Sequence, residues 1–283
     1  MSSLRKLEPS EFPSRLLEIP QPPKNLYLEG ELPQGIYLAI VGSRKYTGYG
    51  QEACEKIVRE LAGRPIVIVS GLALGIDAIA HRAALAAGLA TVAVPGSGLD
   101  RSVLYPSVNR RLADDIIAAG GALLSEFEPS MRPAAWTFPA RNRIMAGLSV
   151  AVLVIEAEQK SGTMITARMA ADYNRDVLAV PGSIFSSQSA GPHLLIKLGA
   201  TPVTSGADVL DALNFHQSNQ QPELFDELSP QEESILKLLR QKPLPREIIL
   251  KESGFSSAET ADALNILEVK GLIQERLGEL STL

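Results

Sequence analysis

The chain has 283 residues, 45% of them hydrophobic and 21% charged, and its formal net charge is −5. This length and composition predict a globular protein with one medium domain and one smaller domain. The single cysteine, Cys54, excludes an internal disulfide and is typical of a reducing compartment. The N-terminus has no apolar signal segment and no apolar run reaches the roughly 18 residues of a membrane span, so we expect a cytoplasmic protein without a membrane partner.

The charge is distributed unevenly along the chain. Residues 1–35 hold 4 basic and 5 acidic side chains, residues 36–209 hold 16 and 14, and residues 210–283 hold 7 and 13. The central part is therefore slightly basic and the C-terminal part acidic. Arguments about charged partners must be made for each domain separately.

The pattern of apolar runs predicts the order of elements. Residues 1–35 are rich in proline and predict an N-terminal extension that is too short to fold alone. Apolar runs predict strands, and amphipathic stretches between them predict helices. The predicted strands are 36–41, 66–69, 91–94, 122–125, 149–155 and 177–180, and the predicted helices are 49–62, 76–87, about 106–119 and 163–173. This alternation over residues 36–213 predicts an α/β fold with a Rossmann-like, doubly wound, mostly parallel sheet.

The last part of the chain has a different pattern. Residues 214–228 are polar and predict a linker. Residues 229–283 then show three helical stretches and a short strand, and Ser229 followed by Glu232 is a typical helix-capping pattern. The order of elements is typical of a small winged-helix domain.

Three polar clusters lie next to predicted strands. Gly42-Ser43-Arg44 follows the first strand, Arg141-Asn142-Arg143 precedes the strand 149–155, and Lys160-Ser161-Gly162-Thr163 follows it and opens a helix. Ligands of open α/β sheets bind beyond the carboxyl ends of the strands, where helix N-termini attract anions. Since Arg, Lys, Asn and Ser donate hydrogen bonds to phosphate oxygens, we predict that these clusters converge on a phosphate. Solvent-facing arginines at a helix start are the alternative.

Other patterns exclude some kinds of site. The stretch 70–77 (SGLALGID) lacks the G-x-G-x-x-G spacing of dinucleotide-binding proteins, so we expect no NAD and no other cofactor, although Gly71 suits close backbone approach of an anion. Asp77 and His81 are four residues apart, and a structural hydrogen bond is the favoured interpretation over a metal or acid–base pair. Without a nucleophile–base set, the residues indicate binding and not catalysis.

At these residues the chain resembles the DprA/Smf family, the DNA-processing proteins of bacterial natural transformation. The shared motifs are GSR at 42–44, SGLALGID at 70–77, AHRAAL at 80–85, LDRSVLYPSVNRRL at 99–112, FPARNRIMAGLS at 138–149, KSGTMITA at 160–167 and VPGS at 180–183. The resemblance implies an extended Rossmann fold, cooperative binding of single-stranded DNA, a homodimer and loading of RecA recombinase onto that DNA. Many members carry a helical N-terminal domain, which a 35-residue extension cannot supply.

By the same resemblance, DNA contacts are expected at eleven positions. They are Ser43, Arg44, Gly71, Phe138, Arg141, Asn142, Arg143, Lys160, Ser161, Gly162 and Thr163. Phe138 is the candidate for a base contact, and the cations are candidates for phosphate contacts. Because aromatic residues are only 5% of the chain, backbone contacts are expected to dominate over base stacking.

Two alternative functions remain open. One is an enzyme that cleaves nucleoside monophosphates at the N-glycosidic bond, whose PGGxGTxxE motif would correspond to KSGTMITA here, with Thr166 and Ala167 where a carboxylate is needed. The other is a transcriptional regulator that uses the winged helix. The expected recognition helix, 256–270, holds three acidic residues and only Lys270, so we predict that it does not read duplex DNA and instead contacts protein or the basic face of the sheet domain.

Overall fold

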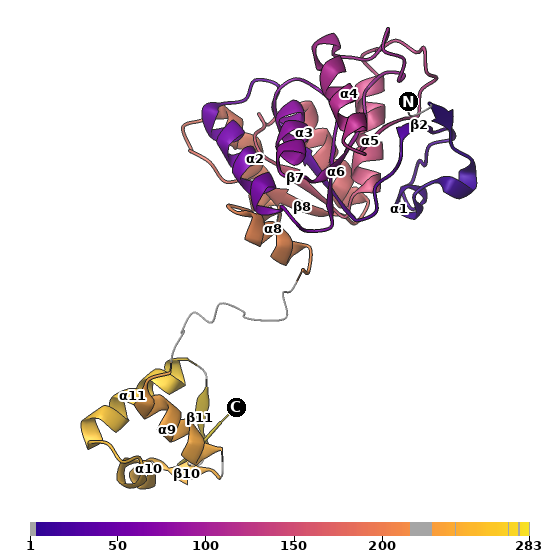
Figure 1. Cartoon of the computed structure of the whole chain (residues 1–283). Coiled ribbons are helices and arrows are strands. Elements are labelled where there is room, and N and C mark those ends of the chain that lie inside the picture. Colours follow the sequence, from indigo (N-terminus) through magenta and orange to yellow (C-terminus); the bar gives the residue numbers. More distant parts are fainter. Residues whose placement is uncertain (1–3, 216–227, 241, 271, 277, 283) are drawn as a thin grey trace. The chain divides into compact units, whose positions relative to one another are not determined.

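The chain divides into two units, a larger one of a sheet covered by helices, Met1–His216, and a smaller one of helices and a three-stranded sheet, Gln217–Leu283 (Figure 1). The computed structural model describes residues 4–215, 228–240, 242–270, 272–276 and 278–282. Most of the predicted linker, 214–228, lies outside these residues.

The sheet of the first unit has nine strands in the order β1-β2-β6-β5-β4-β3-β7-β8-β9. From β3 to β9 all pairs are parallel, whereas β2 pairs antiparallel with β6 and with β1. The prediction of a doubly wound, mostly parallel sheet is confirmed. The strands are β1 (Arg5–Lys6), β2 (Tyr27–Gly30), β3 (Ile36–Val41), β4 (Ile66–Ser70), β5 (Ala90–Ala93), β6 (Ala122–Ser125), β7 (Ala151–Val154), β8 (Asp176–Ala179) and β9 (Thr201–Pro202).

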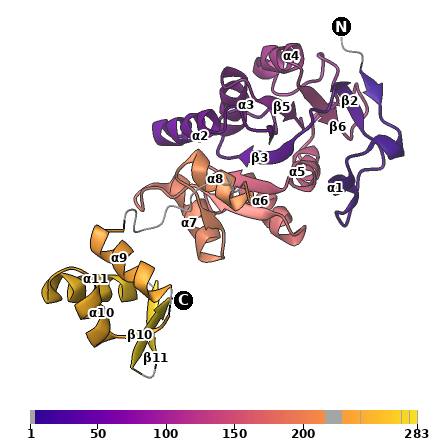
Figure 2. The same cartoon turned by 60° about the horizontal axis from the view of Figure 1, so that its bottom comes forward.

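Helices cover both faces of the sheet, which is why its strands are apolar on both sides (Figure 2). One face is covered by α2 (Gly48–Glu60), α3 (Ile76–Ala86), α4 (Arg110–Ala118) and α8 (Gly206–Ala212). The other is covered by α1 (Ser14–Leu17), α5 (Thr137–Leu148), α6 (Gly162–Asp172) and α7 (Ala190–Lys197). Short 3₁₀ turns occur at Pro9–Glu11, Ser107–Asn109 and Ser187–Ser189.

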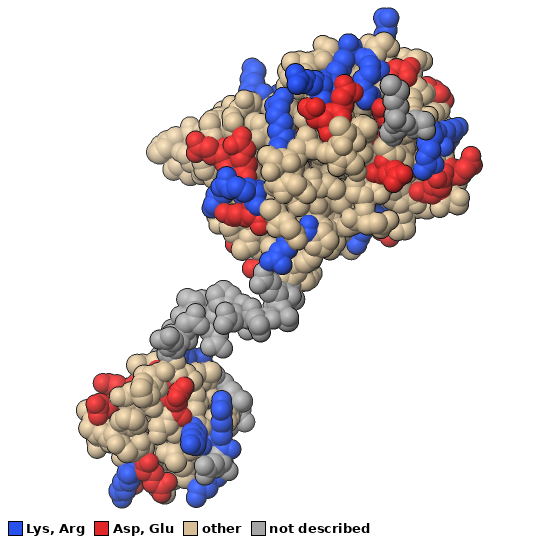
Figure 3. Space-filling view, in the orientation of Figure 1, with Lys and Arg blue, Asp and Glu red and all other residues tan. Residues whose placement is uncertain are grey.

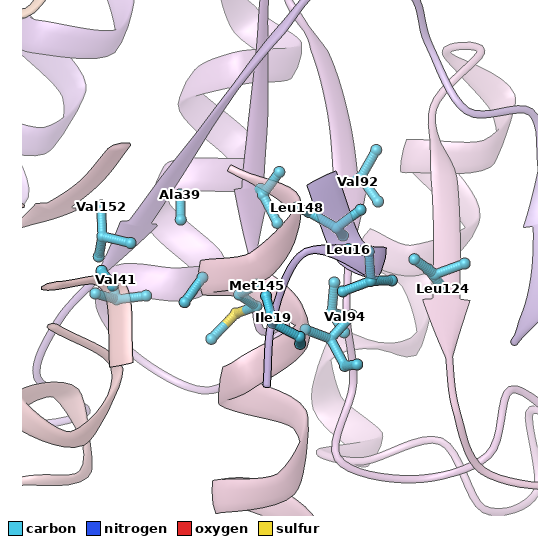
Figure 4. Close-up of a cluster of buried hydrophobic side chains, with 14 of the residues drawn as sticks. Leu16, Ile19, Ala39, Val41, Val92, Val94, Leu124, Met145, Leu148 and Val152 are labelled. Atoms are coloured by element: carbon cyan, nitrogen blue, oxygen red, sulfur yellow. The ribbon is translucent and has the colours of Figure 1, made fainter. Parts of the chain in front are cut away.

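The N-terminal segment is part of this core. Its strand β2 extends the sheet beside β6, and Leu16 and Ile19 pack near Met145 of α5 (Figure 4). The approach is close, since a Cβ at Gly147 of α5 would lie 2.9 Å from Ile19 Cγ2 and 3.0 Å from Leu16 Cδ1. Residues 4–35 thus close one edge of the sheet and cover part of one face.

The predicted elements did not include the helix that precedes β7. Residues 131–136 contain no helix or strand, but α5 begins at Thr137 and contains Arg141 and Arg143. Pro139 does not prevent this helix because it lies in the first turn, where a missing N–H costs no hydrogen bond. The strand β7 lies between β3 and β8, and β4 is at the centre of the sheet.

The second unit has the predicted winged-helix order. Its helices are α9 (Pro230–Leu239), α10 (Arg246–Glu252) and α11 (Ser257–Val269), and its strands are β10 (Leu244–Pro245), β11 (Ile273–Arg276) and β12 (Glu279–Thr282). The strands pair antiparallel in the order β10-β12-β11 over a core that includes Ile235, Leu264 and Leu280. Ser229 and Glu232 form the predicted capping box at the start of α9.

None of the described helices has the length and apolar character that crossing a bilayer requires.

Replacing Leu16 with Ala tests whether the N-terminal segment stabilises the sheet domain. Leu16 is fully buried, whereas its neighbour Leu17 is 50% exposed. We expect Leu16→Ala to lower the free energy of unfolding by about 2–5 kcal/mol. The control, Leu17→Ala, should change it by no more than about 0.5 kcal/mol. Urea unfolding followed by circular dichroism measures both, and equal effects would contradict the assignment.

Candidate functional site

The strand order reverses direction between β3 and β7. From β3 the chain continues to β4 on one side, and β7 pairs with β3 on the other side. In open α/β sheets the helices diverge at such a switch point and leave a crevice beyond the carboxyl ends of the two strands. The clusters predicted from Gly42 and from Lys160 follow β3 and β7, so both lie at this point.

A cleft of about 480 Å³ occupies the switch point. It is lined by the loop after β3, the first half of α5 and the N-terminal turn of α6. Eight of the eleven predicted residues are among those that line it: Ser43, Arg44, Phe138, Arg141, Asn142, Ser161, Gly162 and Thr163. The predicted convergence of three separate clusters is therefore found for these residues.

Arg141 is a buried cation at the base of the cleft. Its side chain comes from α5, and the residue is only 4% exposed. Nη1 donates a hydrogen bond of 2.5 Å to the carbonyl of Val94, and Nε has no partner. Among the described residues no carboxylate oxygen lies within 4 Å of its guanidinium. Burial lowers the pKa of Arg141 to about 10, so it stays charged at neutral pH. The carboxyl of Asp77, also in the cleft, partly offsets this burial, although it forms no ion pair with Arg141. A buried charge without an ion-pair partner is costly, and an anion in the cleft would offset more of that cost.

Gly71 makes room for this guanidinium. A Cβ at Gly71 would lie 1.6 Å from Nη1 of Arg141. The absence of a side chain at Gly71 is therefore needed for Arg141, and the approach of an anion to Gly71 stays a prediction. Gly71 itself lines a small hollow beside the cleft, together with Arg44, Tyr105 and Phe138.

Arg44 and Phe138 lie at the mouth of the cleft. Arg44 is exposed, and its Cζ lies 5.4 Å from the centroid of the Phe138 ring, within the range of a cation–π interaction. The ring of Tyr105 meets Phe138 edge-on, with centroids 5.8 Å apart, and a Cβ at Gly96 would lie 2.6 Å from the Phe138 ring. Phe138 is thus half-buried, which limits the ring surface that it offers to a ligand.

The N-terminus of α6 supplies backbone donors. Its N-cap, Ser161, makes no side-chain cap, and the Oγ of Ser161 is buried without a partner. Asn142 lies beside this turn, with its Nδ2 3.5 Å from the carbonyl of Gly162. A helix start with uncapped N–H groups favours an anion such as phosphate. Lys160 is exposed and precedes this turn, although it is not among the residues that line the cleft.

Arg143 does not belong to the cleft. Its guanidinium forms an ion pair with Glu126, and both side chains are 14% exposed. Arg141 and Arg143 are two positions apart on a helix, so they point in different directions. The sequence pattern grouped them because it could not show that the segment is helical.

Asp77 and His81 have separate structural partners. Asp77 accepts a hydrogen bond of 3.4 Å from the backbone of Ala73, and burial raises the pKa of its carboxyl although Arg141 opposes this. His81 Nδ1 lies 2.7 Å from Thr91 Oγ1, and burial lowers the pKa of the imidazole to about 3. Within the described residues no group of three or more His, Cys, Asp and Glu could hold a metal ion.

Glu156 supports the loop of the cleft in a way that the sequence did not reveal. This buried residue follows β7 and accepts hydrogen bonds from Thr47, at 2.9 Å from the backbone and 2.6 Å from Oγ1. Its carbonyl accepts a 2.7 Å bond from the backbone of Ser43. Glu156 therefore fixes both ends of the loop that carries Arg44. The signal for this role in the sequence was a carboxylate directly after the apolar strand 149–155.

The fold defines a Rossmann-like domain with a cation-lined cleft, followed along the chain by a winged-helix domain. A family model described as DNA recombination-mediator protein A matches residues 4–214, and a DprA winged helix domain model matches residues 219–279. The chain belongs to the DNA recombination-mediator protein A family, as the motifs predicted.

Named relatives cover most of the chain. It is 39% identical to Protein Smf of Escherichia coli (strain K12) over 276 residues, which cover 93% of this chain and 73% of the relative. It is 46% identical to DNA processing protein DprA of Streptococcus pneumoniae over 206 residues, 72% of each chain.

Two solved structures are also similar. The X-ray structure of DprA from Streptococcus pneumoniae has a TM-score of 0.69 and 43% identity, and covers 76% of each chain. The structure of DprA from Helicobacter pylori, described as showing a unique single-stranded DNA binding mode, has a TM-score of 0.66 and 33% identity over 75% of this chain and 98% of that one.

Substituting the two arginines of α5 separates an anion site from a structural ion pair. Arg143→Met leaves Glu126 buried without its counter-charge, so we expect a loss of about 3 kcal/mol in the free energy of unfolding. Arg141→Met removes a costly buried charge, so we expect a loss below about 1 kcal/mol. Added inorganic phosphate should raise the melting temperature of the wild type and of Arg143→Met, but not that of Arg141→Met. An equal phosphate effect on Arg141→Met would contradict the assignment.

Proposed function

We propose that this protein binds single-stranded DNA through its phosphate backbone at the cleft between β3 and β7. The observation that carries the proposal is the buried guanidinium of Arg141, which lines the cleft with no carboxylate within 4 Å in the described residues. The family description and the single-stranded DNA binding of the Helicobacter pylori relative support this choice of ligand. A buried arginine and an uncapped helix start recognise phosphate without reading base identity.

The surface charge of the first unit is mixed. Figure 3 shows Lys and Arg gathered near α3 and α4, with Asp and Glu among them. Attraction for a phosphate backbone therefore depends on the cations at the cleft, which are Arg44, Lys45 and Arg141 on its wall and Lys160 beside it. With about three phosphates neutralised per protomer, the log–log salt slope should be about −2.

We infer that the cleft binds and does not catalyse. Its carboxylates are Asp77 and Glu158, and neither is paired with a nucleophile or base in the way that turnover requires. Asp77 accepts a backbone hydrogen bond, and Glu158 is exposed and accepts one from Gln188. The proposed binding function needs no cofactor.

We also propose that the protein acts as a homodimer in the cytoplasm, protects incoming single strands and loads RecA recombinase onto them during natural transformation or homologous recombination. The description of the family as recombination mediators supports a role in recombination. Sedimentation of the protein, and the rate of RecA assembly on strands that it already covers, are the measurements that test this part.

Replacing Arg44 tests the backbone-binding proposal. Arg44→Ala removes one exposed cation at the cleft, so we expect weaker binding of oligo-dT and a salt slope less steep by about 0.7. Arg59→Ala is the matched control, because Arg59 is exposed at the other end of α2 from the cleft. Fluorescence anisotropy at several salt concentrations measures both. Unchanged binding by Arg44→Ala, or release of base from nucleoside monophosphates, would contradict the proposal.

The winged-helix domain is expected not to bind duplex DNA. The exposed side of α11 carries Glu259 and Asp262, and Lys270 is used in a buried ion pair, with its Nζ 2.9 Å from Glu232. An acidic helix is repelled by the phosphates that flank the major groove. We expect residues 225–283, which include the core of the second unit, to show no duplex binding at micromolar concentration and physiological salt. Micromolar affinity would contradict this.

A further inference from the structure

The loop after β8 carries the most exposed aromatic ring among the large hydrophobic residues that the structure describes. Phe185 is 93% exposed and its neighbour Ile184 is 80% exposed. A phenylalanine ring left in water forgoes the stabilisation that burial of its apolar surface would supply. Such a ring is free to stack on a flat apolar partner.

This loop is held in a defined turn. Ser183 Oγ accepts a hydrogen bond of 3.2 Å from the backbone of Phe185, and Ser186 N donates to the carbonyl of Ser183 at 3.1 Å. The start of the loop is tied to α2 by a 2.5 Å hydrogen bond from the Tyr49 hydroxyl to the carbonyl of Pro181. The ring is therefore presented by an anchored loop.

The end of the loop is connected to the wall of the cleft. Ala157 N donates to the carbonyl of Gln188 at 2.7 Å, and Gln188 Nε2 donates to Glu158 at 3.2 Å. Glu158 is one of the residues that line the cleft. Because β8 pairs in parallel with β7, the loop leaves the same edge of the sheet about 4.8 Å from the strand that borders the cleft.

We propose that Phe185, with Ile184, forms a base-contacting platform for a single strand whose phosphate occupies the cleft. This inference rests on the proposed function and adds a second, apolar contact to it. Aromatic side chains beside a basic groove are the usual way in which single strands are held without sequence preference. Phe138 offers only part of its ring for such a contact, since Arg44 and Tyr105 lie against it.

A protein partner fits this surface less well. Two apolar side chains on a loop rich in serine offer far less than the roughly 800 Å² per partner that a stable protein interface needs. The exposed residues next to them along the chain, Ser183 and Ser187, are polar. A nucleobase, by contrast, needs only one flat ring as its partner.

The test compares binding of Phe185→Ala to oligo-dT and to a matched oligomer whose central positions are abasic. We expect about 5- to 150-fold weaker binding of oligo-dT, corresponding to about 1–3 kcal/mol, and no change on the abasic strand. Phe185→Trp should restore binding of oligo-dT. Leu17→Ala, on the exposed side of α1, is the control and should leave both affinities unchanged.

Each other outcome overturns the inference. Equal losses on the two strands would show that Phe185 does not contact bases. If those losses came with a lower sedimenting mass, the ring would belong to a contact between copies of the chain. Unchanged binding by Phe185→Ala, together with weaker binding by Arg44→Ala, would overturn this inference and leave the proposed function standing. If the wild type bound neither strand, the proposed function itself would fail.

Discussion

The site depends on one buried positive charge at the point where the sheet reverses its strand order. Arg141 comes from α5, contacts the end of β5 through the carbonyl of Val94 and fits only because Gly71 after β4 has no side chain. Three elements that are distant in sequence therefore meet at a single guanidinium. Its charge is only partly offset by the protein, which leaves the cleft ready for an anion.

The loop that carries Arg44 depends on a second buried group, Glu156. Its carboxylate holds Thr47 at the start of α2, and a Cβ at Gly50 would lie 2.3 Å from its Oε2. The negative charge of Glu156 near the start of α2 also interacts favourably with the helix dipole. The buried carboxylate of Glu156 thus supports the exposed Arg44 by fixing the backbone of its loop. The ion pairs of the described residues include none between Glu156 and Arg44.

The two units differ in the way their charged side chains are arranged. The first unit combines a mixed surface with a few cations at one cleft, whereas the second unit presents acidic side chains on α11 and uses Lys270 internally. The Glu232 carboxylate that pairs with Lys270 also completes the capping box of α9. Lys270, the basic residue at the end of α11, therefore stabilises the packing of its own domain.

The sequence by itself determined the alternation of strands and helices, the winged-helix order and the motifs of the family, because these depend on local periodicity and on residue types at fixed spacing. It also placed the clusters at Ser43 and at Ser161 on one edge of the sheet, since parallel strands share an edge. Only the tertiary structure decided which side chains of α5 face the cleft. Arg141 and Arg143 are the same residue type in one short motif, but Arg141 is buried against Gly71 and Arg143 pairs with Glu126. Likewise, the exposure of Phe185 and the covering of Phe138 follow from packing between distant segments, which no local pattern specifies.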